Sequence, residues 1–185
     1  LIVSTAYPDI SEVSKGIGAR VPFLRPQELS QDDSKMMDAI LHAISWYENK
    51  NSRYDIFLYL QPTSPLRNEK HILEAFDTFY KNNADVVISV NEVKNIPQRM
   101  NQLPENFNMS KFLNKKFQHS NRQEFKKYYE LNGAIHIAKW NIIKIHKNWF
   151  VKNSFAYLLA DPFWMDIDSQ MDFDYTEYLL RNGKI

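Results

Sequence analysis

The sequence has no cysteine and only four glycines among its 185 residues. The absence of cysteine excludes disulfides and thiolate zinc sites, and it fits the reducing cytoplasm, where we expect the protein to act. The glycines stand at positions 16, 18, 133 and 183. With that spacing the chain forms neither a GxGxxG nor a GxxxxGK(S/T) motif, so it holds neither of these glycine-rich phosphate loops.

The chain also has no large excess of either charge and no long apolar run. Lysine and arginine outnumber aspartate and glutamate by only 23 to 22, so we expect neither nucleic acid nor an acidic membrane surface as a partner. No apolar run approaches the roughly 18 residues of a membrane span. Hydrophobic residues make up 44% of the chain and aromatic residues 14%, which predicts one folded domain with a substantial core over residues 1–185.

Short apolar segments alternate with helical patterns along the chain. LIVST (1–5), YDIFLYL (54–60), ADVVISV (84–90) and GAIHIA (133–138) have the length and composition of buried strands. Helices are predicted between them, and the first of these should bury Ile10, Val13 and Ile17. Strand, helix and strand in this rhythm indicate an α/β fold with a largely parallel sheet.

Residues 91–127 interrupt this pattern with a polar stretch that has isolated phenylalanines and no sustained periodicity. A solvated, charged loop is one interpretation. A loop of this length inside a compact domain is usually functional or bound to a partner. We therefore favour an inserted arm that carries short strands and packs on another subunit.

Four aspartates lie close together near the end of the chain. Asp166 and Asp168 follow an apolar segment and are two residues apart, so on an extended strand both would point to one side. Two carboxylates on one face suit Mg²⁺, which takes its remaining ligands from water and phosphates. Alternatively, Asp168 or Asp172 caps the following helix. In that helix Tyr175, Tyr178 and Leu179 should face the core.

The loop QPTSPLR (61–67) follows a predicted strand. Open α/β sheets bind ligands beyond the carboxyl ends of their strands, where this loop would lie. Gln61 and the hydroxyls of Thr63 and Ser64 can form hydrogen bonds, and Arg67 can bind a carboxylate or phosphate with two nitrogens. The alternative is a proline-rich turn before a helix capped by Asn68, with the arginine in a salt bridge.

Five segments occur along the chain in the order IVST, FLRPQEL with HAI downstream, LQPTSPLR, NRQEF…YELNGAIHI and DIDSQMDF. Together they resemble the acylneuraminate cytidylyltransferase family, the CMP-sialic acid synthetases and their legionaminate and pseudaminate relatives. The resemblance implies a doubly wound, mostly parallel sheet, as in nucleotide-diphospho-sugar transferases, and a homodimer whose arms exchange contacts. It also implies an enzyme of cell-surface polysaccharide biosynthesis that joins CTP to a sialic-acid-like nonulosonic acid and releases pyrophosphate.

The resemblance also implies a set of site residues. Asp166 and Asp168 would be the catalytic pair that holds Mg²⁺ against the triphosphate, and Arg25 would lie near the nucleotide. The sugar acid would be bound by Gln61, Thr63, Ser64, Arg67, Tyr129 and Asn132.

Three departures from the family pattern leave alternatives open. We expect the chain to lack the family's N-terminal phosphate loop, of the type IPARGGSKGIPRKN. Ala6 replaces an aspartate, and Lys35 and Met36 replace small hydroxyl residues. The alternatives are a non-catalytic relative of the same fold and a nucleotidyltransferase for an eight-carbon sugar acid or a sugar 1-phosphate.

Overall fold

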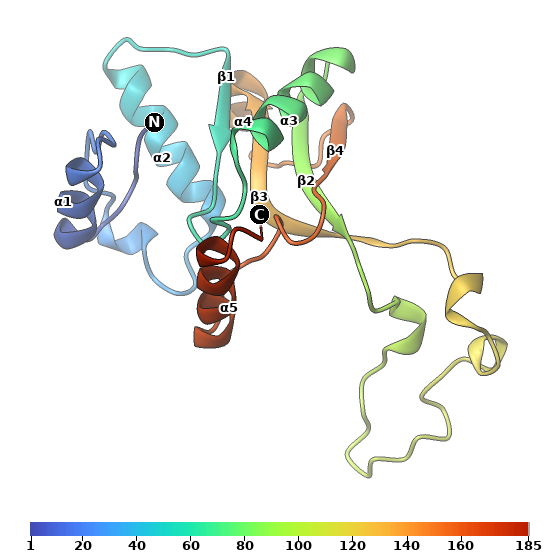
Figure 1. The fold of residues 1–185 in the computed structure, drawn as a ribbon. Helices are drawn as coiled ribbons and strands as arrows, with labels where there is room; N and C mark the ends of the chain where they lie inside the picture. Colours follow the sequence, from blue (N-terminus) through green and yellow to red (C-terminus); the bar gives the residue numbers. More distant parts are fainter. Residues whose placement is uncertain (185) are drawn as a thin grey trace. The chain divides into compact units, whose positions relative to one another are not determined.

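The computed structural model describes residues 1–184, except for the side chain of Arg122. Its helices and strands are interspersed along the chain, as in the α/β class (Figure 1). The sequence analysis predicted this class, and the structure confirms it. The elements are α1 (Pro8–Gly16), α2 (Met36–Asn49), β1 (Ile56–Tyr59), α3 (Glu69–Lys81), β2 (Val86–Glu92), β3 (Tyr129–Lys139), α4 (Trp140–His146), β4 (Ser154–Leu158) and α5 (Gln170–Arg181).

The strands form one four-stranded sheet in the order β1-β3-β2-β4. β2 and β4 run parallel, with Val86 opposite Ser154 and Val90 opposite Leu158. The sheet as a whole is mixed rather than largely parallel. The segment 1–5, predicted as a strand, forms only isolated bridges from Ile2 to Arg20 and from Thr5 to Leu24.

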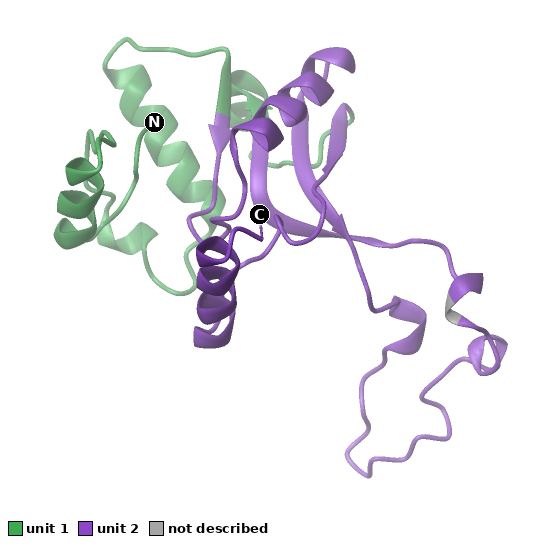
Figure 2. Cartoon of the chain, viewed as in Figure 1, with its two compact units in different colours: residues 1–57, 138–152 green, residues 58–137, 153–185 purple. Residues whose placement is uncertain are grey.

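The chain divides into two compact units, residues 1–57 with 138–152 and residues 58–137 with 153–185 (Figure 2). In the second unit, β2 contributes Val86, Val87 and Ile88 to the core, each at most 4% exposed. Helix α3 packs on β2 and β4 and buries Ala75 and Phe79. A continuous apolar strand covered in this way is typical of the interior of an α/β sheet.

Helix α1 of the first unit differs from its prediction. The helix forms, but its buried residues are Ser11 and Ser14. Ile10, Val13 and Ile17 are 45%, 68% and 83% exposed, so the prediction that this stripe is buried is wrong. The small serine side chains, rather than the apolar ones, face the rest of the unit.

Helix α5 of the second unit also differs in part from its prediction. Leu179 is buried as expected, but Tyr175 and Tyr178 are 48% and 53% exposed, so the prediction that these tyrosines face the core is wrong.

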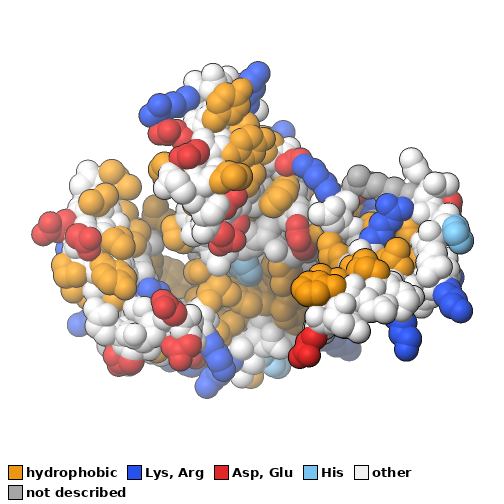
Figure 3. Space-filling model, turned by 90° about the horizontal axis from the view of Figure 1, so that it is seen from below, with side chains coloured by type: hydrophobic (Ala, Val, Ile, Leu, Met, Phe, Trp, Pro, Cys, Tyr) orange, Lys and Arg blue, Asp and Glu red, His pale blue; other side chains and the backbone are white. Residues whose placement is uncertain are grey.

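An arm of residues 93–128 connects β2 to β3 within the second unit (Figure 1). Because β2 continues to Glu92, the arm starts two residues later than predicted. The described part of the arm has three short 3₁₀ turns in place of the predicted short strands. Large apolar side chains are exposed on it beside lysines and arginines (Figure 3); they include Met100, Leu103, Phe107 and Met109.

Within residues 1–184, no helix has the length and apolar character needed to cross a membrane.

Candidate functional site

The loop 61–67 follows β1 and is held by two of its own polar residues. Arg67 Nη1 donates a hydrogen bond to the Gln61 carbonyl at 2.6 Å, and another to the Ser64 carbonyl. Ser64 is fully buried, and its hydroxyl donates to the Asn132 carbonyl at 3.5 Å. Burial lowers the pKa of the Arg67 guanidinium. Arg67 thus binds loop carbonyls, rather than the carboxylate of the predicted salt bridge.

A backbone hydrogen bond joins this loop to the acidic segment. The Ile167 N–H donates to the Thr63 carbonyl at 2.8 Å. Asp166 and Asp168 flank Ile167, so two candidate carboxylates and the candidate sugar loop lie next to each other within the second unit. The segment that carries them forms neither a helix nor a strand, in contrast to the prediction.

Asp166 and Asp168 form no hydrogen bond or ion pair through their side chains with the described residues. Asp166 Oδ1 is buried without a partner there, and Asp168 is exposed. Ser169 caps α5, and Asp172 completes the capping box by accepting the Ser169 N–H at 2.8 Å. The Ser169 hydroxyl bond lowers the pKa of Asp172. The capping role predicted for Asp168 or Asp172 therefore falls to Ser169 with Asp172, and Asp168 stays available.

This donor set suits a hard cation bound jointly with a ligand. Residues 1–184 contain no group of three or more His, Cys, Asp or Glu side chains able to hold a metal alone. Two carboxylates without partners, one with a buried oxygen, match Mg²⁺, which takes its remaining ligands from phosphate oxygens and water. A buried carboxylate oxygen without a donor is costly, and a cation would satisfy it.

Asn132 in β3 is fixed by a buried network. Ser89 Oγ accepts the Ile135 N–H at 2.8 Å, so its own proton points to Asn132 Oδ1, 2.6 Å away. The Ala134 N–H also donates to Asn132 Oδ1, at 3.2 Å. With the oxygen bound twice, the orientation of the amide is set. Nδ2 of Asn132 is buried and has no partner among the described residues, so two N–H donors remain available.

Gln61 lies against the backbone of Gly133, the residue after Asn132. A Cβ built on Gly133 would lie 1.5 Å from Gln61 Oε1. Gly133 also has a φ of +69°, a conformation that side chains disfavour. The Asn-Gly pair lies within β3, and its glycine makes room for Gln61.

The remaining predicted site residues are Tyr129 and Arg25. Tyr129 is 50% exposed at the start of β3. Side chains alternate along a strand, so Tyr129 projects from the face opposite to Asn132. Arg25 lies in the first unit, where its Nε donates to Ser30 Oγ at 2.8 Å and its N–H to the Thr5 carbonyl at 2.7 Å.

Sequence reasoning missed Ser89 and Gly133. A lone serine in the apolar run VVISV and a glycine inside a strand are both available signals, since a strand glycine often marks close approach of another group. The partner of each residue is distant in sequence, however, so neither signal shows what is approached.

No protein-family model matches the chain. Several curated relatives do match. The N-acylneuraminate cytidylyltransferase of Escherichia coli is 32% identical over 94% of this chain and 40% of its own length. The pseudaminic acid cytidylyltransferase of Campylobacter jejuni is 26% identical, and the CMP-N,N'-diacetyllegionaminic acid synthase of Legionella pneumophila 29%; each match covers 98% of this chain and 78% of the relative.

A solved structure is similar in fold. It is a CMP:2-keto-3-deoxy-manno-octonic acid synthetase in complex with CTP, with a TM-score of 0.64 over 98% of this chain and 80% of the other, at 11% identity. The homologues across the chain, at 26–32% identity, confirm the resemblance found in the sequence. The chain spans about 40% of the length of the E. coli relative. The activity of the whole protein is therefore proposed below.

Proposed function

We propose that the protein is a cytidylyltransferase that joins CTP to a nonulosonic acid and releases pyrophosphate. The single observation that carries this proposal is the Ile167–Thr63 backbone bond, because it brings the candidate sugar loop beside two carboxylates without partners. The homology to cytidylyltransferases of three such sugar acids supports it independently.

The sugar acid would be bound by Gln61, Thr63 and Asn132. Asn132 Nδ2 offers two oriented donors to a carboxylate or hydroxyl of the sugar, and Thr63 presents an exposed hydroxyl. Ser64 and Arg67 act on this site indirectly, because they hold the loop in shape. Binding in a fixed orientation lowers the barrier by placing the attacking hydroxyl near the reacting phosphate.

In the reaction, the anomeric hydroxyl oxygen attacks the α-phosphorus of CTP. A new P–O bond forms while the bond to the bridging oxygen of the β-phosphate breaks, and pyrophosphate leaves with the electron pair. Asp166 and Asp168 would hold Mg²⁺, which supplies charge that stabilises the triphosphate and the leaving group. The hydroxyl proton passes to solvent in this scheme, since no base is assigned.

Two further contacts belong to the proposal. One of them is Arg25, a candidate for binding the nucleotide, and the other is the arm. The arm of residues 93–128 would pack on a second copy of the chain, because its large apolar side chains are exposed in the single chain.

Pyrophosphate release tests the proposal directly. The purified protein is incubated with Mg²⁺ and CTP and, in turn, with N-acetylneuraminate, legionaminate, pseudaminate and an eight-carbon sugar acid. We expect release with CTP and one nine-carbon acid, no release with UTP, and loss of release when a chelator is added. Asp166→Asn should abolish release, while Asp77→Asn on the exposed side of α3 should leave it unchanged.

Other results would identify the alternatives. Release only with the eight-carbon acid, or with a sugar 1-phosphate, would replace the proposed substrate class. No release with any acid, together with measurable binding of the acid, would show a non-catalytic relative that retains the sugar site.

A further inference from the structure

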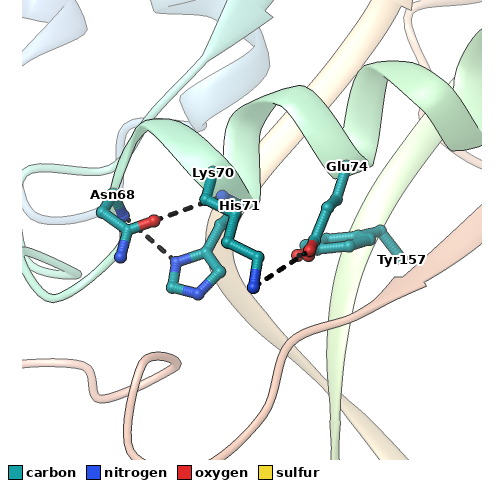
Figure 4. Close-up of polar contacts among 5 residues, drawn as sticks. All are labelled: Asn68, Lys70, His71, Glu74 and Tyr157. Carbon is teal, nitrogen blue, oxygen red and sulfur yellow. Dashed lines mark hydrogen bonds and ion pairs between the residues drawn. The ribbon is translucent and has the colours of Figure 1, made fainter.

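Helix α3 begins with a capping box in which a histidine takes an unusual part. The Asn68 side chain accepts the His71 N–H at 3.3 Å, and the Asn68 N–H donates to His71 Nδ1 at 3.1 Å (Figure 4). Glutamate or glutamine commonly fills this position, and both accept through an oxygen. The imidazole can accept only while Nδ1 carries no proton, so this contact exists only in the neutral histidine.

The capping box lies where the candidate loop meets the acidic segment. Asn68 directly follows Arg67, which ends the loop. The His71 ring lies 4.4 Å from the ring of Phe163, three residues before Asp166. Four residues farther along from Phe163, Ile167 donates to the Thr63 carbonyl. His71 therefore contacts the residue directly after the loop and a residue three positions before Asp166, next to both segments that the proposed function requires side by side.

We infer that His71 is a positioning residue that keeps the loop 61–67 beside the acidic segment while its ring is neutral, and loosens this contact when the ring is protonated. The inference concerns the geometry of the site. Its effect on catalysis rests on the proposed function.

The charges around His71 set the direction of the effect. His71 is 8% exposed, and burial, with a smaller contribution from Lys70, lowers the pKa of its imidazole, while Glu74 opposes the shift. Glu74 is itself bound by Lys70 at 3.8 Å and by the Tyr157 hydroxyl of β4 at 2.7 Å (Figure 4). The segment after β4 presents the apolar ring of Phe163. The neutral form is thus favoured at pH 7, and protonation belongs to the acid side of 6.5.

Substitutions at His71 separate positioning from simple packing. His71→Gln supplies an amide oxygen that accepts the Asn68 N–H and does not titrate. His71→Ala removes the acceptor at every pH. His146→Gln is the control, because His146 is exposed at the end of α4 in the other unit.

The first measurement is amide hydrogen exchange at Ile167 and Asn68 between pH 5 and pH 8, corrected for intrinsic exchange. We expect protection of both amides to fall roughly fivefold in the wild type on acidification, the factor that corresponds to losing a helix cap. This pH dependence should be absent in His71→Gln and persist in His146→Gln. In His71→Ala the protection of both amides should be low at every pH. An unchanged pH dependence in His71→Gln would overturn the inference.

The second measurement is the pH profile of pyrophosphate release. KM for the sugar acid should rise several-fold on the acid side in the wild type and stay flat in His71→Gln, with KM for CTP unaffected in both. An acid-side rise that survives in His71→Gln would count against the positioning role. If the wild type releases no pyrophosphate at any pH, the proposed function fails, and the exchange measurement still decides the role of His71.

Discussion

At Gly133 the main chain of β3 and the side chain of Gln61 occupy adjoining space. A methyl group there would overlap Gln61 Oε1, at 1.5 Å. We expect Gly133→Ala to displace Gln61 and raise KM for the sugar acid at least tenfold, while KM for CTP changes little. Steady-state kinetics with each substrate varied in turn measures both constants.

Gly18→Ala is the matched control for Gly133→Ala. Gly18 also has a positive φ, +87°, but no atom lies within 4 Å of its added Cβ. Both variants therefore carry backbone strain of about 1–3 kcal/mol, and only Gly133→Ala carries the overlap. Equal KM values for the acid in the two variants would show that Gln61 has no part in binding it.

Ser89 acts on Asn132 from the neighbouring strand. Ser89→Ala leaves the Ile135 N–H and one side of Asn132 Oδ1 without a partner, which should lower the free energy of unfolding by about 1–3 kcal/mol. It should also raise KM for the sugar acid, because the Asn132 amide is no longer fixed. Val87→Ala, two residues earlier in β2 and equally buried, should lower stability without changing KM. A KM that moves equally in both variants would refute the orienting role.

His136 makes the fold sensitive to acid. Burial lowers the pKa of His136 to about 4, and its ring meets that of Tyr59 at 5.7 Å. The unfolded chain binds the proton more readily, so the stability from the neutral ring is complete above pH 6.5 and is lost as pH falls through 4. The full effect is about 3 kcal/mol. His71 contributes in the same direction.

Urea unfolding at pH 7.5 and pH 4.5 tests this acid sensitivity. We expect a smaller loss of stability on acidification for His136→Gln than for the wild type, and an unchanged loss for His119→Gln, whose ring is exposed on the arm. If His136→Gln loses as much stability on acidification as the wild type, His136 is not the cause of the acid sensitivity.

Among the elements, α5 depends on its capping box. Ser169→Ala removes the acceptor for the Asp172 N–H and the hydroxyl that lowers the pKa of Asp172. We expect a loss of about 1 kcal/mol in the free energy of unfolding, read from thermal or urea transitions. The loss should shrink at low pH, where Asp172 is protonated in both proteins. Ser110→Ala in the exposed arm is the control, and an equal loss there would remove the cap as the cause.

Local signals were sufficient for the elements whose causes are local. Asn68 identified the first residue of α3, and the apolar run of β2 identified the strand. Periodicity also located α1, but it shows only which residues are apolar. It does not show what covers them, and Ile10 and Val13 are exposed.

The candidate site was predictable to the same extent. The loop 61–67 and Asp166 stood out because of their composition and their place after apolar segments. Their contact depends on the Ile167–Thr63 bond, and the orientation of Asn132 depends on Ser89, 43 residues earlier. Contacts at that separation are set by the packing of the sheet, which no local pattern specifies.

At the scale of the whole molecule, the arm raises the question of what its apolar side chains contact. Leu103 is 54% exposed and Phe107 73%, and both lie on a segment without strands or long helices. Burying a side chain of this size contributes about 1.5–3 kcal/mol of stabilisation, and packing against a second copy of the chain would bury both. The proposed homodimer therefore predicts that Leu103→Glu with Phe107→Glu yields monomers.

Sedimentation velocity over a range of protein concentrations measures this change. The matched control is Leu73→Glu with Tyr80→Glu, which places the same charges on exposed apolar positions of α3, 56% and 65% exposed. We expect dimers for the wild type and the control and monomers for the arm variant. Monomers for the wild type would show that the arm does not join two copies. Dissociation by the α3 charges alone would move the interface from the arm to that helix.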